Sequence, residues 1–187
     1  MKRSLILLTV VALFGVVGTA VAADAPIRGT DQADVLTGTP GDDVIAALGG
    51  NDIVTALAGN DRVYAGKGND TVEAGPGDDF VRGGEGDDTL RGGEGNDVLR
   101  GRPGNDTIEG GPGNDVIWVG KGADHEFGGE GDDVMHALAN DNQVDTIDCG
   151  PGNDVVYLNA NEHDNAINCE KVITRTPTAA QAAGDDK

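Results

Sequence analysis

A nine-residue period in aspartate constrains this chain more than any other feature of its sequence. Residues 83–100 read GGEGDDTLR and then GGEGNDVLR. Steps of nine residues from Asp88 reach an Asp each time, and a Gly lies two residues before nearly all of them. Self-similarity at a fixed period is the signature of a repeat architecture. The periodic residues are Asp34, Asp43, Asp52, Asp61, Asp70, Asp79, Asp88, Asp97, Asp106, Asp115, Asp124 and Asp133.

Each unit divides into a turn and a short strand. The first six positions are rich in Gly, which suits turns that need positive φ or close backbone approach. The last three read x-apolar-x, and alternate side chains of a strand face opposite ways, so the middle residue points inward. That inward residue is apolar in every unit except at Glu126. Two units make one coil of 18 residues, and stacked coils predict an all-β solenoid with two parallel sheets around an apolar column.

The Asp residues then form two columns, one starting at Asp34 and the other at Asp43, with an 18-residue spacing in each. Like charges ~5 Å apart repel by about 3 kcal/mol at an effective dielectric of 20. We therefore expect the chain to need a cation in order to hold this shape. Ca²⁺ accepts about six to eight oxygens in a flexible geometry, whereas Mg²⁺ demands a tight octahedron.

The units resemble the calcium-binding nonapeptide GGxGxDxUx of the RTX, or hemolysin-type, family. The resemblance covers residues 29–136 and is best at 83–100, 110–115 and 128–133. It implies a right-handed parallel β-roll that holds Ca²⁺ between turns n and n+2 by ladder Asp and turn carbonyls. Leu48 and Leu57 depart from the pattern by replacing a turn Gly. The implied ligands are the twelve periodic Asp residues, Asp154, and turn residues Gly84, Gly86, Gly93, Gly95, Gly104, Gly111 and Gly113.

Composition agrees with cation-coupled folding. The chain has a net charge of −20, 31 Gly and 3% aromatic residues, so a conventional globular core is not available. Acidity of this kind argues against nucleic acid as a partner, because nucleic acid needs a basic surface. Residues 29–136 contain 23 acids and 7 bases, or −16, while five gaps on each side of six coils give up to about ten Ca²⁺ sites. Full occupancy would overshoot neutrality, so we expect some sites to be weak or empty.

The N-terminal residues 1–23 have the pattern of a secretory signal peptide. Lys2 and Arg3 precede the apolar stretch 5–17, and small residues at 20–23 suit cleavage. A membrane anchor is the alternative, but the stretch is short and no stop-transfer charges follow it. We therefore expect a secreted, extracellular protein with no membrane span after processing, which suits weak calcium sites.

The repeat changes after the regular array at 24–136. Asp145 follows Asp133 by 12 residues instead of nine, and Asp145 and Asp154 centre two further units. We interpret 137–173 as irregular last repeats and a C-terminal cap, in which Ile167, Val172 and Ile173 close the apolar column. Residues 174–187 have the composition of a disordered tail.

The two cysteines, Cys149 and Cys169, suggest a disulfide that staples this cap. An even cysteine count in a secreted chain favours pairing, and a 20-residue closure contributes ~3 kcal/mol on the chain-entropy model. Metal ligation with His163 is the alternative, although two Cys without a CxxC pair fit zinc spacings poorly.

One predicted outer face differs from the acidic rest of the chain. It combines apolar, aromatic and basic residues at Tyr64, Phe80, Arg82, Val98, Arg100, Val116 and Trp118. Ordinary cross-strand pairing on an exposed sheet explains such a face. The alternative is an interaction face for self-association or for a cell-surface polymer.

No catalytic pattern is apparent, so we do not expect an enzyme. Ser4 is the only Ser and lies in the predicted signal peptide, which leaves no Ser for a Ser-His-Asp triad. His125-Glu126 begins like HExxH, but Gly129 fills the second His position. The first functional hypothesis is a secreted calcium-binding repeat protein with a structural or scaffolding role. The alternatives are an adhesin or polymer-binding module and an ice-binding solenoid built on the outward column Thr71, Thr89 and Thr107.

Overall fold

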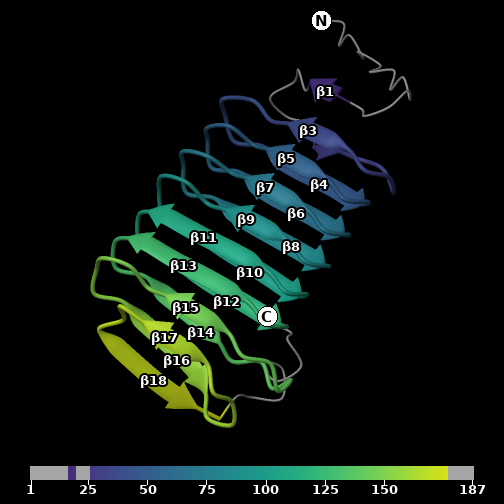
Figure 1. The fold of residues 1–187 in the computed structure, drawn as a ribbon. Coiled ribbons are helices and arrows are strands. Elements are labelled where there is room, and N and C mark those ends of the chain that lie inside the picture. Colours follow the sequence, from purple (N-terminus) through teal and green to yellow (C-terminus); the bar gives the residue numbers. More distant parts are fainter. Residues whose placement is uncertain (1–16, 20–25, 177–187) are drawn as a thin grey trace, which may run out of the picture.

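The chain winds into a two-sheet solenoid, described by a computed structural model over residues 17–19 and 26–176. Each sheet contains nine parallel strands, and odd and even strands alternate between the sheets (Figure 1). Sheet A consists of β1 (Val17–Thr19), β3 (Val35–Thr37), β5 (Ile53–Thr55), β7 (Thr71–Glu73), β9 (Thr89–Arg91), β11 (Thr107–Pro112), β13 (His125–Glu130), β15 (Thr146–Asp148) and β17 (Asn165–Ile167). Sheet B consists of β2 (Ile27–Arg28), β4 (Val44–Gly49), β6 (Arg62–Lys67), β8 (Phe80–Glu85), β10 (Val98–Pro103), β12 (Val116–Lys121), β14 (Val134–Ala137), β16 (Val155–Asn159) and β18 (Lys171–Arg175).

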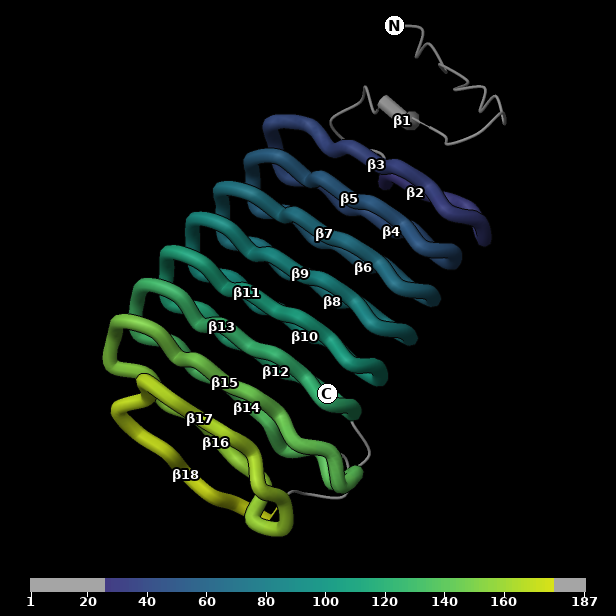
Figure 2. The backbone as a smooth tube through the Cα atoms, in the orientation of Figure 1, coloured from purple at the N-terminus to yellow at the C-terminus, as the bar shows by residue number. Residues whose placement is uncertain are grey.

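The register confirms the predicted coil of 18 residues. Leu90 on β9 pairs with Ile108 on β11, and Val81 on β8 pairs with Leu99 on β10. Each turn of the backbone therefore lies directly over its predecessor, as the tube in Figure 2 shows. The strands are parallel throughout, because every coil runs in the same direction.

The apolar column lies between the sheets as predicted, and a second inward position widens it. Leu36, Val54, Val72, Leu90 and Ile108 are buried in one core cluster with their counterparts from sheet B. The first turn residue of several units also points inward, and it is Ala at 47, 56, 65 and 74 and Val at 119. Several strands are six residues long instead of the three that the repeat predicts, because their pairing continues into the turn, where Leu48 pairs with Gly66 and Gly66 pairs with Gly84.

The phase change at 138–145 inserts a loop without interrupting the stack. Leu138 and Ala139 of this loop are buried, and β15 pairs with β13 as the earlier strands do. The expectation for the end of the column is only partly met. Val172 faces the column but is 51% exposed, whereas Ile167 and Ile173 pair with the outward residues Asp148 and Tyr157. The three residues therefore do not form a closed cap.

The disulfide between Cys149 and Cys169 is present and joins residues whose Cα atoms are 5.1 Å apart. Cys149 belongs to the buried core cluster, and Cys169 packs against it. The bond ties the turn before β16 to the segment before β18, and metal ligation by these thiols is thereby ruled out.

Two predicted segments lie largely outside the described residues. Of the predicted signal peptide, only Val17–Thr19 is described, as β1 beside β3. Of the predicted tail 174–187, Thr174 and Arg175 belong to β18, and residues 177–187 are outside the description. Within the described part of the chain, no helix is long and apolar enough to cross a membrane.

Candidate metal centre

The periodic Asp residues form two ladders, one along each edge of the solenoid. The ladder that begins at Asp34 precedes the strands of sheet A, and the ladder that begins at Asp43 precedes those of sheet B. In each, a backbone N–H donates to the carboxylate one coil further on. The N–H of Asp70 donates to Oδ1 of Asp88 at 2.8 Å, and the N–H of Asp88 donates to Oδ1 of Asp106 at 2.8 Å. One oxygen of each interior carboxylate is thus used to stack the coils.

The second carboxylate oxygen of these residues does not take part in the stacking of the coils. The Oδ2 atoms of the interior rungs are buried and lack a hydrogen-bond partner among the described residues. Burial of an unpaired polar group costs about 1–3 kcal/mol each, so one such atom per rung is unusual in a native protein. The atoms belong to Asp52, Asp61, Asp70, Asp79, Asp88, Asp97, Asp106, Asp115, Asp124, Asp133, Asp154 and Asp164.

A backbone carbonyl from the next coil lies beside the unpaired oxygen. A Cβ atom placed on Gly83 would be 2.3 Å from Oδ2 of Asp88 and 3.0 Å from the carbonyl oxygen of Gly101. On Gly110 the same atom would meet Oδ2 of Asp115 at 2.3 Å and the carbonyl oxygen of Gly128 at 2.4 Å. Two oxygens from successive coils therefore border the small space that the missing side chain leaves.

The electrostatics show how unfavourable the ladders are by themselves. Burial, followed by the neighbouring carboxylates, raises the pKa of Asp88 to about 7 and that of Asp106 to about 8. The N–H of the preceding rung opposes the shift, but it does not cancel it. Repulsion between rungs thus contributes to the raised pKa values, but loss of hydration on burial is the larger cause.

The first rung of each ladder is built differently. Thr30 and Thr39 both donate a backbone N–H and a hydroxyl to the Oδ2 atom of Asp34 and of Asp43 respectively. These two Asp residues were predicted as metal ligands like the others, but their Oδ2 atoms already have partners from the protein. The signal was visible in the sequence, because both first units read GTxxxD.

The seven predicted turn glycines all have positive φ, between 113° at Gly111 and 149° at Gly104. Leu48 and Leu57 hold the same position with φ of 84° and 86°. Arg102 is a third residue with a side chain at this position, with φ of 89°. An L-residue with a side chain costs roughly 1–2 kcal/mol in this conformation, so these three turns are strained relative to their neighbours.

The ladders extend beyond the residues that the period predicts. The N–H of Asp124 donates to Oδ1 of Asp145 at 3.0 Å, and that of Asp145 donates to Oδ1 of Asp164 at 3.2 Å. On the other edge, Asp154 donates to Oε2 of Glu170 at 2.9 Å. Asp164 and Glu170 escaped prediction because their spacing departs from 18 and because Glu replaces Asp in one of them.

Glu126 is confirmed in the inward slot and is fully buried between Ile108 and Ile147. Neither of its carboxylate oxygens has a hydrogen-bond partner among the described residues. Burial, followed by the charges of Asp145, Asp124 and Asp164, raises its pKa well above the ordinary value. It is the one acid in a column that is otherwise apolar from Leu36 to Val156.

The donor set of the ladders fits a hard cation such as Ca²⁺. Most rungs combine a carboxylate oxygen that has no partner among the described residues with nearby carbonyl oxygens, and these are the ligands that Ca²⁺ prefers. In residues 26–176, no three His, Cys, Asp or Glu side chains cluster as a metal site. A cation between two rungs would therefore draw much of its coordination from backbone carbonyls.

Comparison with known protein families agrees with this geometry. The model of the RTX calcium-binding nonapeptide repeat matches residues 28–63, 55–90, 64–99, 91–126, 110–144 and 127–161. These matches span 28–161, more than half of the 187 residues. The chain belongs to the RTX calcium-binding nonapeptide repeat family. All six matches of this RTX chain are to the repeat, and none is to a catalytic domain. A search of curated proteins gave no match.

Proposed function

We propose that this RTX chain is a secreted protein that folds when Ca²⁺ binds between its stacked turns and that serves as a structural or scaffolding element outside the cell. Family membership and the stacked Asp turns support calcium binding. The scaffolding role rests on the shape, because two nine-stranded sheets in a thin rod offer an extended surface.

One observation carries the proposal: the same unpaired, buried Oδ2 recurs on the interior rungs of both ladders. The residues that would hold the ions are the interior Asp residues of the ladders, including Asp154, together with carbonyls of the Gly-rich turns. Bound Ca²⁺ would supply a positive charge and the missing partner for each Oδ2. Glycines such as Gly83 and Gly110, which directly precede the positive-φ turn glycines, leave the space for it, since a Cβ on either would lie 2.3 Å from Oδ2 of Asp88 or Asp115.

We expect fewer bound ions than there are gaps between the stacked coils. Thr30 and Thr39 already satisfy Asp34 and Asp43, so the first rung of each ladder needs no ion. This fits the charge balance, because the positive charge of about ten divalent ions would exceed the net charge of −16 on residues 29–136. Equilibrium dialysis against calcium tests it, with fewer than about ten ions per chain expected. Binding of one ion or none would refute the ladder as the metal centre.

Secretion is proposed from the N-terminal sequence. Residues 1–23 have the charged, apolar and small-residue regions of a signal peptide. If they are removed, β3 becomes the edge strand of sheet A. The intact mass of protein recovered from the medium tests this, because a cleaved chain begins near Asp24. Recovery of the uncleaved chain in the cell alone would contradict export.

A second candidate function, binding to a cell-surface polymer, is favoured by the outer face of sheet B. The two outward columns that flank the inward residue of each strand contain no Asp or Glu, although the whole chain has 33 acids. We define these columns, from Arg28 on β2 to Lys171 and Ile173 on β18, together with Arg175, which lies over the ring of Tyr157, as the basic face. It contains all seven residues that the sequence suggested as an interaction face.

A further inference from the structure

We propose that the basic face binds an acidic polysaccharide, one that carries carboxylate or sulfate groups, along the axis of the rod. This inference rests on the second candidate function and on the folded roll, and it names the class of partner. The cations that would recognise the polymer are Arg28, Arg62, Arg82, Arg100, Lys171 and Arg175.

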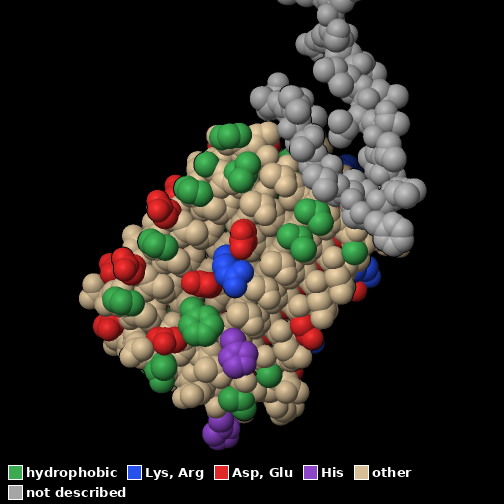
Figure 3. Space-filling view, turned by 45° about the horizontal axis from the view of Figure 1, so that its top comes forward, with side chains coloured by type: hydrophobic (Ala, Val, Ile, Leu, Met, Phe, Trp, Pro, Cys, Tyr) green, Lys and Arg blue, Asp and Glu red, His purple; other side chains and the backbone are tan. Residues whose placement is uncertain are grey.

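Charge is distributed differently on the outer faces of the two sheets. On sheet A, Arg91 lies between Glu73 at 3.8 Å and Glu109 at 3.4 Å, so its charge is balanced within the protein. Figure 3 shows one face of the rod on which basic groups have acidic neighbours in this way. The basic face has no acid in its columns, and Arg62 and Arg82 form no ion pair or hydrogen bond with any described residue. An anion from outside would provide the balance.

Two arginines of the basic face lie side by side on neighbouring strands. Arg82 on β8 is the direct register partner of Arg100 on β10. Like charges directly opposite on neighbouring strands destabilise a sheet. Two guanidinium groups side by side on neighbouring strands are suited to a ligand that presents repeated negative charges.

Three aromatic side chains toward the C-terminal end of the face are covered and leave little stacking surface for a partner. Trp118, His136 and Tyr157 stack on one another, with ring centroids 3.6 and 4.8 Å apart. Arg100 lies over Trp118, and Arg175 lies over Tyr157, which covers the outer faces of the stack. Single-stranded nucleic acid binds through exposed aromatic faces, and none is offered by this stack. Ring edges and guanidinium groups remain, and they suit a ligand rich in hydroxyl and anionic oxygens.

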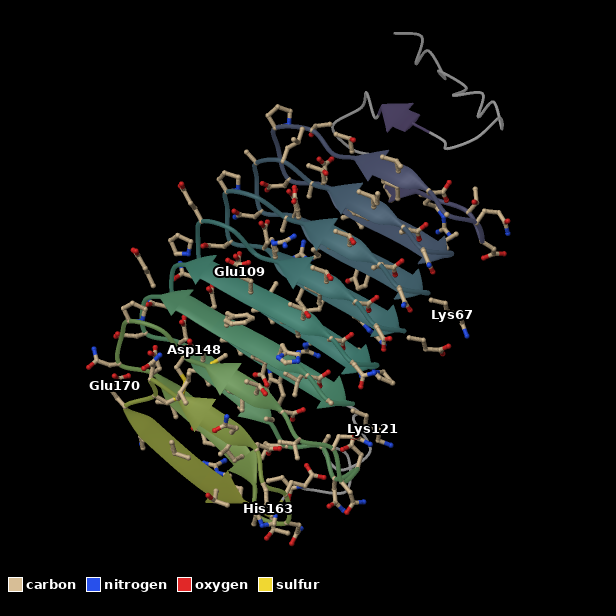
Figure 4. All side chains as sticks on the ribbon, in the orientation of Figure 1. Lys67, Glu109, Lys121, Asp148, His163 and Glu170 are labelled. Carbon is tan, nitrogen blue, oxygen red and sulfur yellow. A yellow bond between two sulfur atoms is a disulfide. The ribbon has the colours of Figure 1, made fainter. Side chains whose placement is uncertain are left out.

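A groove at the edge of the basic face gives such a polymer a place to bind one unit. Its volume is about 480 Å³, and it is lined by Tyr64, Lys67, Arg82 and Arg102 together with glycine backbone at 83 and 84. This lies within the usual range of small-ligand sites, about 300–1,000 Å³. Lys67 pairs with Glu85 at 2.8 Å on the rim, and Figure 4 shows Lys67 on the same edge of the rod as Lys121.

Binding should depend on calcium for a reason separate from folding. Close to half of the chain's 33 acids lie in the ladders, and a polyanion is repelled by them. Charges more than about 8 Å away are largely screened at physiological ionic strength, but the ladders flank the face on both edges. Calcium on the rungs therefore removes the nearest repulsive charges.

The test is binding of the full-length protein to immobilised dextran sulfate in millimolar CaCl₂, with neutral dextran as the blank. The variant Arg62→Gln/Arg82→Gln is compared with Arg91→Gln/Lys121→Gln, which loses the same charge away from the basic face. We expect the first variant to bind about tenfold more weakly and to reduce the slope of log affinity against log salt by about 2. The control should stay within about twofold of the parent protein.

Three results would overturn the proposal. Equal weakening by both variants would show a net-charge effect, and failure of the parent protein to bind would remove the partner. Equally tight binding to double-stranded DNA, with the same sensitivity to Arg62→Gln/Arg82→Gln, would place the partner in another class. Circular dichroism of the same samples separates the two proposals. A β spectrum without binding refutes this inference alone, whereas a coil spectrum in calcium refutes the calcium-folded roll as well.

Discussion

The backbone N–H of Asp70 donates a 2.8 Å hydrogen bond to Oδ1 of Asp88 on the next coil, while Oδ2 of Asp88 is buried without a partner among the described residues. The two oxygens of one carboxylate thus have separate roles. The first fixes the register of the coils, and the second is left for a cation. Substitutions can separate these roles, because Asn keeps an oxygen acceptor and loses the charge.

Asp88→Asn should weaken calcium binding at two neighbouring gaps and leave the stack intact. We expect a higher calcium concentration at the folding midpoint and a loss of about 1–3 kcal/mol in the free energy of unfolding at saturating calcium. Urea unfolding followed by circular dichroism measures both. Asp43→Asn is the matched control, because Thr39 already satisfies that carboxylate, and it should shift the calcium midpoint less. Equal shifts would show that the Thr residues do not substitute for an ion.

Thr39→Val should destabilise the roll without changing the number of bound ions. The substitution keeps the shape of the side chain but removes the hydroxyl that donates to Asp43 at 3.0 Å. The expected loss is about 1 kcal/mol, measured by urea unfolding in calcium. Thr55→Val, on the outward side of sheet A, is the control and should have a smaller effect. A gain of one bound ion in Thr39→Val would indicate that the threonine blocks a site.

Glu126→Leu should stabilise the protein, which is the reverse of most core substitutions. Both carboxylate oxygens of Glu126 are buried without a hydrogen bond from any described residue, and its register neighbours are Ile108 and Ile147. Removal of the unpaired acid should raise the free energy of unfolding by about 1–3 kcal/mol. Thermal unfolding in calcium, together with dialysis, provides the measurement. A loss of a bound ion would instead make Glu126 a ligand.

In a chelator, the roll should be more stable at pH 5 than at pH 9. Burial raises the pKa of Asp61 to about 6, of Asp88 to about 7 and of Asp106 to about 8, above the ordinary 3.8 of the unfolded chain. The folded state therefore binds protons more tightly, and its stability falls as the pH rises through about 6–8. Circular dichroism in EGTA across this range tests the sign. A β signal that grows with pH would contradict it.

The sequence predicts the repeating part of this fold well and its ends poorly, for a physical reason. Leu90 and Asp88 recur because every interior coil meets identical neighbours above and below, so the same residue types are needed each time. At the ends that symmetry is lost. At the first rung Thr30 donates to Oδ2 of Asp34, and at the last rung Glu170 accepts the backbone hydrogen bond that an Asp accepts elsewhere. The second inward position, at residues such as Ala47, was also missed, because Gly and Ala share it and show no apolar pattern.

The measurement that tests the account most directly is far-UV circular dichroism of the purified protein, titrated with Ca²⁺ and separately with Mg²⁺ at neutral pH. We expect a coil spectrum in chelator and a cooperative transition to β structure with Ca²⁺ at sub-millimolar to millimolar concentration, with little response to Mg²⁺. Full β structure in excess chelator at neutral pH would contradict it. The apolar column and the disulfide would then suffice for folding, and the unpaired Oδ2 atoms would need another explanation.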